Sequence, residues 1–235
     1  GSKTSSSITI LASQPVNGGE LYFDCEGDCD TNLNTWTTTN SANVTGLTNN
    51  TGYTFRVKAR NNDNIETSYS TDLNIYTHAP IPTLTAGPLS TTSISLSGTG
   101  VQNLSAGDSG IFFDCTIEEC DTGIQDWVKS TTDVAINLQP NSEYSFRVKA
   151  RNYTGEETSY SSEVAAWTLA VVPSIENATT LNSSQIDVQI NKETNPNHTE
   201  LLLQETYSGM YVNLSTGLLE PTPVWGHLDG LTPTI

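Results

Sequence analysis

The sequence has few positive charges and no long apolar runs. Only 9 lysines and arginines stand against 26 acidic residues, which gives a formal net charge of −17. So acidic a chain repels phosphate groups, which argues against binding nucleic acid or anionic lipid through a basic face. No stretch reaches the roughly 18 consecutive apolar residues that a membrane-spanning helix needs. We therefore expect neither a nucleic-acid partner nor insertion into a membrane.

Catalytic signatures are also missing. The three histidines, His78, His198 and His227, are isolated and fall in expected loops or junctions. The sequence contains no GxSxG, HExxH, P-loop or GxGxxG pattern. Its units are too short to carry a cleft-forming insertion. We therefore expect no enzymatic activity and no catalytic residue.

What the sequence does contain is a long internal repeat. Residues 53–61 read YTFRVKARN, and residues 144–152 read YSFRVKARN, 91 positions later. The FDC, Trp and ETSYS segments recur at nearly the same spacing, so the period indicates an array of like domains. A fainter third copy is found at 184–190 and 200–205, without the cysteines and without the FRVKARN segment.

The repeated segment alternates apolar and polar residues. Tyr53, Phe55, Val57 and Ala59 alternate with threonine, arginine and lysine. This period of two, in short runs broken by Gly, Asn or Pro, is typical of antiparallel strands in a sandwich. The chain is therefore predicted to be all-β.

Six of the nine basic residues lie in the two FRVKARN segments. One interpretation is a cationic stripe for a polyanion. The other is pairing across the sheet, because Glu20, Asp24 and Glu26 alternate along a neighbouring predicted strand. We favour pairing, since opposite charges on adjacent strands stabilise a sheet.

The four cysteines form two close pairs, Cys25 with Cys29 and Cys115 with Cys120. The pairs are about 90 residues apart in separate repeats, so they are poorly placed to share one zinc ion. The spacing also differs from a thioredoxin-like motif. We expect a local disulfide in each hairpin, which makes the hairpin rigid and places the protein in an oxidising compartment, secreted or at the cell surface.

The order Leu47, Tyr53, Phe55, Val57, repeated from Leu138, resembles the sixth strand and its approach in fibronectin type III domains. The chain is similar in particular to tandem arrays in secreted bacterial and archaeal surface proteins. The resemblance implies tandem immunoglobulin-like (fibronectin type III) β-sandwiches. It also implies that Tyr53 and Tyr144 are tyrosine-corner residues, whose hydroxyl groups bond to upstream backbone. The family's second-strand tryptophan is absent, so we expect Trp36 and Trp127 to fill part of the core instead.

Prolines 80, 82 and 173 indicate short, stiff junctions between domains. We expect one domain at 1–79 with a short or missing first strand, a second at 80–171, and a partial third at 172–235 that lacks its last strands. The sequence allows two explanations of the missing strands. Either it is part of a longer array, which we favour, or a neighbouring copy supplies strands in a filament.

Acidic residues crowd both cysteine hairpins and suggest calcium as a cofactor, because hard oxygen ligands on a constrained loop suit Ca²⁺. The alternative, which we favour, is ordinary solvated acidity with no cofactor. The candidate ligands are Asp24, Glu26, Asp28, Asp30, Asp114, Glu118, Glu119 and Asp121.

Asn-x-Ser/Thr sequences raise the hypothesis of N-linked glycans. Their number is close to what chance gives in a chain so rich in Asn, Ser and Thr. The candidate sites are Asn43, Asn49, Asn103, Asn152, Asn177, Asn182, Asn197 and Asn213. Four aromatic residues could stack on sugars, but we favour a place in the core or in cross-strand pairs: Tyr22, Tyr69, Tyr160 and Trp225.

We therefore expect a non-catalytic extracellular array that serves as a spacer in a surface adhesin, stalk or filament. Its expected partners are neighbouring repeats of a longer chain, other copies of itself, a carbohydrate or a cell-surface protein. Two alternatives stay open. The chain could be a set of accessory or linker modules of a secreted polysaccharide-degrading enzyme, or a filament subunit that assembles by strand exchange.

Overall fold

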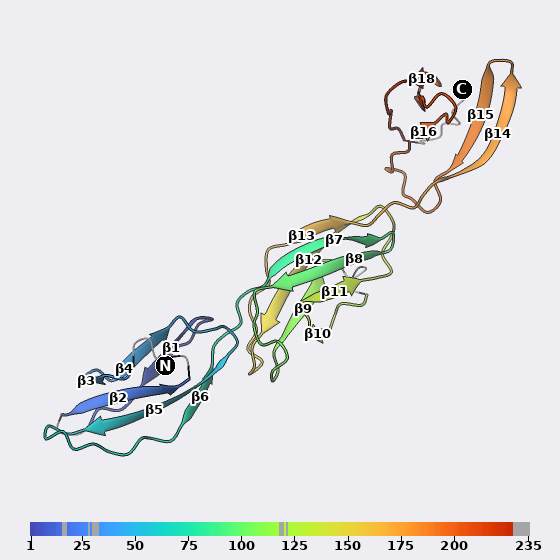
Figure 1. Ribbon diagram of the computed structural model, residues 1–235. Helices are drawn as coiled ribbons and strands as arrows, with labels where there is room; N and C mark the ends of the chain where they lie inside the picture. Colours follow the sequence, from blue (N-terminus) through green and yellow to red (C-terminus); the bar gives the residue numbers. More distant parts are fainter. Residues whose placement is uncertain (16–17, 28, 30–32, 118–119, 121, 228–235) are drawn as a thin grey trace.

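The computed structural model describes residues 1–15, 18–27, 29, 33–117, 120 and 122–227. Figure 1 shows three groups of strands that follow one another along an elongated chain, joined by the short segments 77–82 and 168–173. We call them the first unit (β1–β6), the second unit (β7–β13) and the third unit (β14–β18). The described residues include no helix long and apolar enough to cross a membrane.

The second unit is a two-layer antiparallel sandwich. One layer has the order β11-β8-β7 and the other has the order β10-β9-β12-β13. Three strands in one layer and four in the other make a fibronectin type III-like sandwich. The strands are β7 Thr83–Ser90, β8 Ser93–Thr99, β9 Gly110–Cys115, β10 Trp127–Val128, β11 Thr132–Ala135, β12 Glu143–Arg151 and β13 Val164–Trp167.

The first unit repeats this plan. Its four-stranded layer has the order β3-β2-β5-β6, and its other layer holds β1 and β4. The strands are β1 Ser7–Leu11, β2 Glu20–Glu26, β3 Trp36–Thr37, β4 Ser41–Thr45, β5 Gly52–Arg60 and β6 Leu73–Tyr76. The all-β prediction and the sandwich architecture are therefore confirmed.

The alternation along the repeated strand decides which side chains enter the core. Phe146 and Val148 of β12 are 0 % exposed, as is Phe113, which lies opposite Val148 on β9. In the first unit Phe55 is buried, whereas Val57 is only partly buried. The valine at this position of the repeat is thus less well covered in the first unit (Val57) than in the second (Val148).

The difference between these two cores has a visible cause. In the second unit β7 lies against β12 and β13 and contributes Leu84 and Ala86 to the core. Among the described residues of the first unit, β1 pairs only with β4 and with a single bridge at Lys3. An apolar groove of about 460 Å³ lies beside Val57 and Leu73. Val57 therefore borders a groove, whereas Val148 is fully buried.

The third unit consists of two small sheets. β14 pairs with β15 along its whole length, yet every residue of β14 is exposed. In the described part of the chain, no third strand extends this sheet. An apolar groove of about 740 Å³ separates it from the second sheet. The strands are β14 Ser174–Asn182, β15 Gln185–Asn191, β16 Leu203–Gln204, β17 Tyr211–Val212 and β18 Leu219–Glu220.

One expectation about the core is wrong. Trp36 and Trp127 do not fill it, because they lie half-buried on the outer face of the four-stranded layers. Trp36 pairs with Tyr22, which lies between the buried residues Leu21 and Phe23 on β2. A residue between two buried residues of a strand faces outward, and the residue paired with it on the next strand faces the same side of the sheet.

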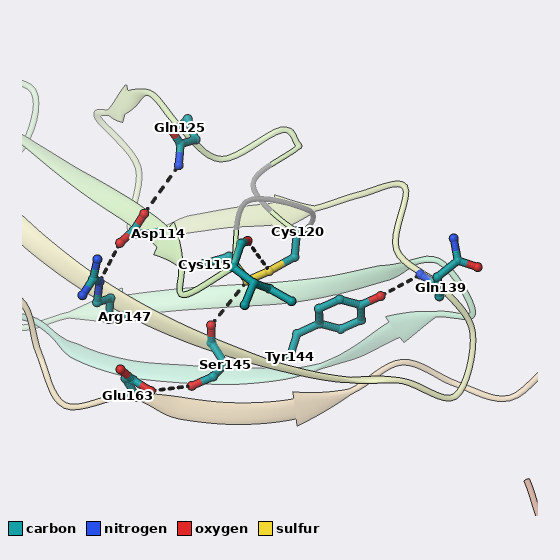
Figure 2. The surroundings of a disulfide bond; sticks show 10 residues. Asp114, Cys115, Cys120, Gln125, Gln139, Tyr144, Ser145, Arg147 and Glu163 are labelled. Atoms are coloured by element: carbon teal, nitrogen blue, oxygen red, sulfur yellow. Dashed lines mark hydrogen bonds and ion pairs between the residues drawn. A yellow bond between two sulfur atoms is a disulfide. The ribbon is translucent and has the colours of Figure 1, made fainter. Parts of the chain in front are cut away.

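The two corner tyrosines of the repeat, Tyr53 and Tyr144, both bond to upstream backbone. The amide of Thr48 donates to the hydroxyl oxygen of Tyr53 at 2.8 Å, and the amide of Gln139 donates to that of Tyr144 at 2.9 Å. Figure 2 shows Tyr144 extending to Gln139 at the end of the sandwich. This contact ties the loop before β12 to the core, because the ring of Tyr144 is only 8 % exposed.

We predict that Tyr144→Phe lowers the free energy of unfolding of the second unit by about 1 kcal/mol, the net value of one hydrogen bond. The phenyl ring keeps the packing, so the loss reports the hydroxyl contact alone. Urea unfolding of the whole chain, followed by amide signals of β12, measures it. Tyr207→Phe is the matched control because Tyr207 is 99 % exposed. Equal stability of the Tyr144→Phe and Tyr207→Phe proteins would contradict this role.

Candidate functional site

The cysteine hairpins are compact and closed. The structure joins Cys25 to Cys29 and Cys115 to Cys120, with Cα atoms 6.0 and 5.8 Å apart. Cys29 and Cys120 are 1 % and 0 % exposed, so each bridge belongs to the core of its unit. Figure 2 shows the second bridge beside the ion pair of Asp114 and Arg147. Two buried disulfides fit a protein of an oxidising compartment.

The calcium hypothesis is not decided by these hairpins. Asp28, Asp30, Glu118, Glu119 and Asp121 lie outside the described residues. Of the others, Asp24 and Asp114 each bind an arginine at 2.6 Å, and Glu26 is exposed. No group of three or more potential ligands occurs within the described ranges. Calcium binding stays a prediction.

The basic residues of β5, and the matching residues of β12, form a ladder with carboxylates and aromatic rings. Arg56 bonds to Asp24 at 2.6 Å and lies over the ring of Tyr69 at 4.4 Å. Arg60 bonds to Glu20 at 2.5 Å, so the predicted pairing across the sheet is confirmed for both arginines. Glu26, by contrast, lies opposite Thr54.

The lysine between the two arginines of β5 pairs with a carboxylate that does not belong to β2. The ammonium of Lys58 bonds to Glu66 at 2.7 Å, and this hydrogen bond raises the pKa of Lys58 above its ordinary value. Lys149 bonds to Glu157 at 2.6 Å in the second unit, with the same effect on its pKa. Tyr22, Tyr69 and Tyr160 all lie within this cation–aromatic ladder. The cations named here are thus paired with carboxylates of their own unit.

One arginine of the ladder on β12 departs from this pairing. Arg151 lies over the ring of Trp127 at 4.5 Å, but its Nε atom is buried and has no hydrogen-bond partner among the described residues. In the first unit the matching Arg60 is held by Glu20, whereas Gly110 stands opposite Arg151. The second unit thus has glycine at the position where the first unit has the carboxylate of Glu20.

The two units end in the same polar arrangement. Thr77, just after β6, accepts from the amide of Thr51 at 3.0 Å and donates to the carbonyl of Thr48 at 2.8 Å. Thr168, just after β13, makes the matching bonds with Ser142 at 3.1 Å and with Gln139 at 2.6 Å. This threonine base fixes the loop that faces the next unit.

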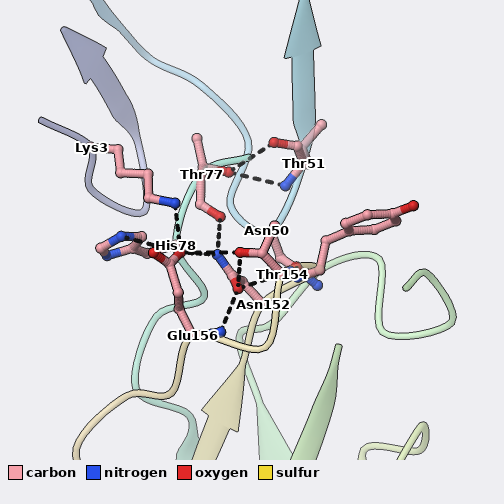
Figure 3. A network of polar contacts seen from close by, with 9 residues as sticks. Lys3, Asn50, Thr51, Thr77, His78, Asn152, Thr154 and Glu156 are labelled. Carbon is pink, nitrogen blue, oxygen red and sulfur yellow. Dashed lines mark hydrogen bonds and ion pairs between the residues drawn. The ribbon is translucent and has the colours of Figure 1, made fainter. Parts of the chain in front are cut away.

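Asn50 lies on this base and connects the first unit to the second. Its amide nitrogen donates to the carbonyl of Gln102 at 2.7 Å. Its amide oxygen accepts from the hydroxyl of Ser109 at 3.1 Å and from the backbone N–H of Tyr153 at 2.8 Å. The side chain is 2 % exposed, and Figure 3 shows it enclosed between loops of both units.

Asn49, the residue before Asn50, also binds the second unit. Asn49 donates to the carbonyl of Gly100 at 3.1 Å and accepts from the amide of Gln102 at 2.8 Å. Asn103 donates to the hydroxyl of Thr51 at 2.8 Å in return. The loop after β8 is therefore bound to the first unit by side chains from both directions.

The other side of this junction is charged. Lys3 of the first unit bonds to Glu156 of the second at 2.6 Å, and Asn152 donates to the same carboxylate at 2.8 Å (Figure 3). The hydrogen bond from Lys3 lowers the pKa of Glu156 below its ordinary value of 4.5. His78 lies 3.7 Å from this carboxylate and is charged only when protonated.

An aromatic pair completes the first junction. The rings of Tyr76 and Tyr153 stack with centroids 3.9 Å apart and an interplanar angle of 1°. Tyr76 is the last residue of β6, and Tyr153 follows β12 of the second unit. The stack covers one face of each ring at the boundary between the units.

The second junction is built from matching residues of the second unit. Asn141, 91 positions after Asn50, donates to the hydroxyl of Thr199 at 2.8 Å. The backbone of Val171 is bound at both its N–H and its carbonyl by the amide of Asn195, at 2.8 and 2.7 Å. Trp167, the counterpart of Tyr76, contacts His198 with the two rings nearly perpendicular and their centroids 5.9 Å apart.

The sequence analysis did not identify these junction asparagines. Asn49, Asn103 and Asn152 were named only as glycan sites, and Asn152 is 0 % exposed. A glycan on the side-chain nitrogen of any of the three replaces a junction hydrogen bond. Asn43, Asn177, Asn182 and Asn197 are exposed, and Asn213 is half-buried. The available signal was that Asn50 and Asn141 recur three positions before the corner tyrosines.

No family model and no curated protein matches this chain. Among solved structures, it is similar to the FN1–FN3 domains of chicken CNTN1, with 14 % identity and a TM-score of 0.40 over 100 % of this chain and 85 % of that one. It is also similar to a two-domain fibronectin type III segment of chicken tenascin, with 14 % identity and a TM-score of 0.44 over 70 % and 94 %. The assignment of the fold rests on the strand order of the first two units.

We predict that Asn50→Gly loosens the junction between the first two units without unfolding either. Asn50 has a φ of 49°, a conformation that glycine adopts readily, so only the side-chain contacts are lost. Amide hydrogen exchange is expected to show loss of protection at Tyr153, whose acceptor is Asn50. Amides in β5 and β12 are expected to keep theirs.

Asn64→Gly is the matched control for this variant. Asn64 has a φ of 60° and lies in the loop after β5, away from the junction bonds described above. Its replacement is expected to leave the exchange of Tyr153 unchanged. If Asn50→Gly left Tyr153 as well protected as Asn64→Gly does, Asn50 would not hold the junction.

We predict that the first junction loosens in acid. The pKa of Glu156 is lowered when Lys3 is bound, so the contact is present above pH 4.5 and is lost as the pH falls through that lower value. Ring-current shifts of Tyr76 and Tyr153 follow the stack between pH 6 and about pH 3. Glu156→Gln is expected to reduce the pH response, whereas Glu157→Gln, which alters a pair within one unit, is expected to keep it. An unchanged response in Glu156→Gln would refute the assignment.

Proposed function

We propose that this chain is a non-catalytic extracellular spacer array, part of a surface adhesin, stalk or filament that holds neighbouring parts at a set distance and orientation. The observation that carries the proposal is the enclosed amide of Asn50. All of its hydrogen-bond partners named above belong to the second unit. A buried amide keeps its partners because leaving them unpaired costs about 1–3 kcal/mol.

Two further features support a spacer. The threonine base recurs at Thr77 and Thr168, so successive units present the same platform to the next unit. The segments between units are short and contain Pro80, Pro82 and Pro173, which restrict the backbone. The two disulfides support a location outside the cytosol.

The charged ladder fits the same function. Its cations are paired with carboxylates or lie over aromatic rings, so they do not form an open surface for a polyanion. What remains on the surface is a strong excess of negative charge, which favours solubility and disfavours close packing of many copies.

Electron microscopy of the purified chain tests this proposal. The longest strands have nine residues, about 30 Å at roughly 3.3 Å per residue. We therefore expect rods with three beads in a narrow range of angles. The Asn50→Gly variant is expected to bend at the first junction, while the second junction keeps its angle. A wild-type protein with freely varying angles would contradict the spacer function.

A further inference from the structure

The second junction contains an open hollow beside an aromatic residue. Its volume is about 620 Å³, which lies within the range of roughly 300–1,000 Å³ typical of small-molecule sites. Two tryptophans and several polar side chains line it. The residues that matter here are Trp167, Trp225, His198, His227, Glu200 and Asn141.

A comparison of the two junctions shows that one aromatic ring in the hollow is partly uncovered. Tyr76 and Trp167 are the last residues of β6 and β13, at matching places in the repeat. Tyr76 is covered face to face by Tyr153 at 3.9 Å. Trp167 is not stacked on a ring in this way: its contact with His198 has an interplanar angle of 75°, and Trp167 is 45 % exposed. The second junction thus presents an aromatic face where the first presents a completed stack.

Trp167 is held in place without any ligand. Its indole nitrogen donates to the carboxylate of Glu143 at 3.1 Å, directly across the β12–β13 pair. His198, which contacts Trp167, lies with Nε2 3.0 Å from the carbonyl of Asn141. A wall fixed in advance loses little freedom on binding, which favours affinity.

The rest of the lining is polar. Glu200 and His227 lie 3.9 Å apart and are both well exposed to solvent. A carboxylate accepts hydrogen bonds, and imidazole donates or accepts, so this rim suits a ligand with several hydroxyl groups. Glu200 and the net charge of −17 disfavour an acidic ligand. A flat, weakly polar ring with hydroxyls at its edge fits both parts of the hollow.

We propose that this hollow binds a neutral pyranose ring of an oligosaccharide. The C–H face of the sugar stacks on Trp167, Trp225 forms a second wall, and the hydroxyls bond to Glu200 and the two imidazoles. The site goes beyond the spacer function, because it gives one junction of the array a ligand. It does not depend on how stiff the array is.

The test is a titration of the whole 235-residue chain with neutral hexasaccharides of glucose, mannose and N-acetylglucosamine, and with hexagalacturonate. Calorimetry and tryptophan fluorescence report binding. We expect at least one neutral hexasaccharide to bind, and Trp225→Ala to weaken it by about tenfold or more, as for an aromatic anchor. Trp225→Phe is expected to retain most of the affinity.

Two controls make the outcome decisive. Trp225 is 58 % exposed, so its replacement is not expected to disturb folding, and the melting temperature checks this. Tyr207→Ala removes a ring that is 99 % exposed and lies outside the hollow, and it should leave affinity unchanged. The proposal is overturned if no neutral sugar binds, if only hexagalacturonate binds, or if Trp225→Ala binds as well as Tyr207→Ala.

Discussion

The arrangement of the first two units depends on one buried side-chain amide. Asn50 is enclosed at 2 % exposure, and its donor and acceptor both need partners in the buried boundary between the units. Those partners are Gln102, Ser109 and the backbone of Tyr153, which come from two different loops of the second unit. Because hydrogen bonds are directional, three of them to one amide define an orientation as well as a contact. An apolar patch of equal area would bind the units without setting an angle.

The second constraint is the division of each strand between two environments. Inward residues such as Phe55 and Phe146 make the cores, and outward residues make the ladder of ion pairs and rings. The ladder explains how an acidic protein uses its few cations. Each exposed pair adds little to stability, yet a cation between a carboxylate and a ring is fixed in position. The ladder therefore orders the segment that runs from Glu66 to Tyr69 alongside β5.

Much of the fold could be predicted from the sequence because period and register are local properties. The alternation at Tyr53, Phe55 and Val57 is enough to predict a strand, and the acids of β2 are enough to predict where Arg56 and Arg60 find partners. The position of Trp36 was predicted wrongly, because a large aromatic residue was assumed to be in the core. Its cross-strand neighbour Tyr22 faces outward, and Trp36 gains its contacts there.

The junctions could not be predicted in the same way. Asn50 looks like any loop asparagine until the second unit is placed against it, and its partners are 52 to 103 positions away. No sequence period connects Asn50 to Tyr153. The glycan hypothesis drew attention to neighbouring asparagines through a motif of three residues, which carries no information about contacts between units. What distinguishes Asn152 is its complete burial, a property of the assembled pair of units.

The two junctions show how a repeat can acquire different properties at successive positions. The threonine base and the asparagine above it are the same in both, so they belong to the repeated unit. The aromatic contact depends on the residue that the next unit supplies, a stacked tyrosine in one case and a nearly perpendicular histidine in the other. The asparagine contacts the next unit at both junctions, whether or not the aromatic face is covered. A face left uncovered at one junction is therefore free to bind a ligand without loss of the array's geometry.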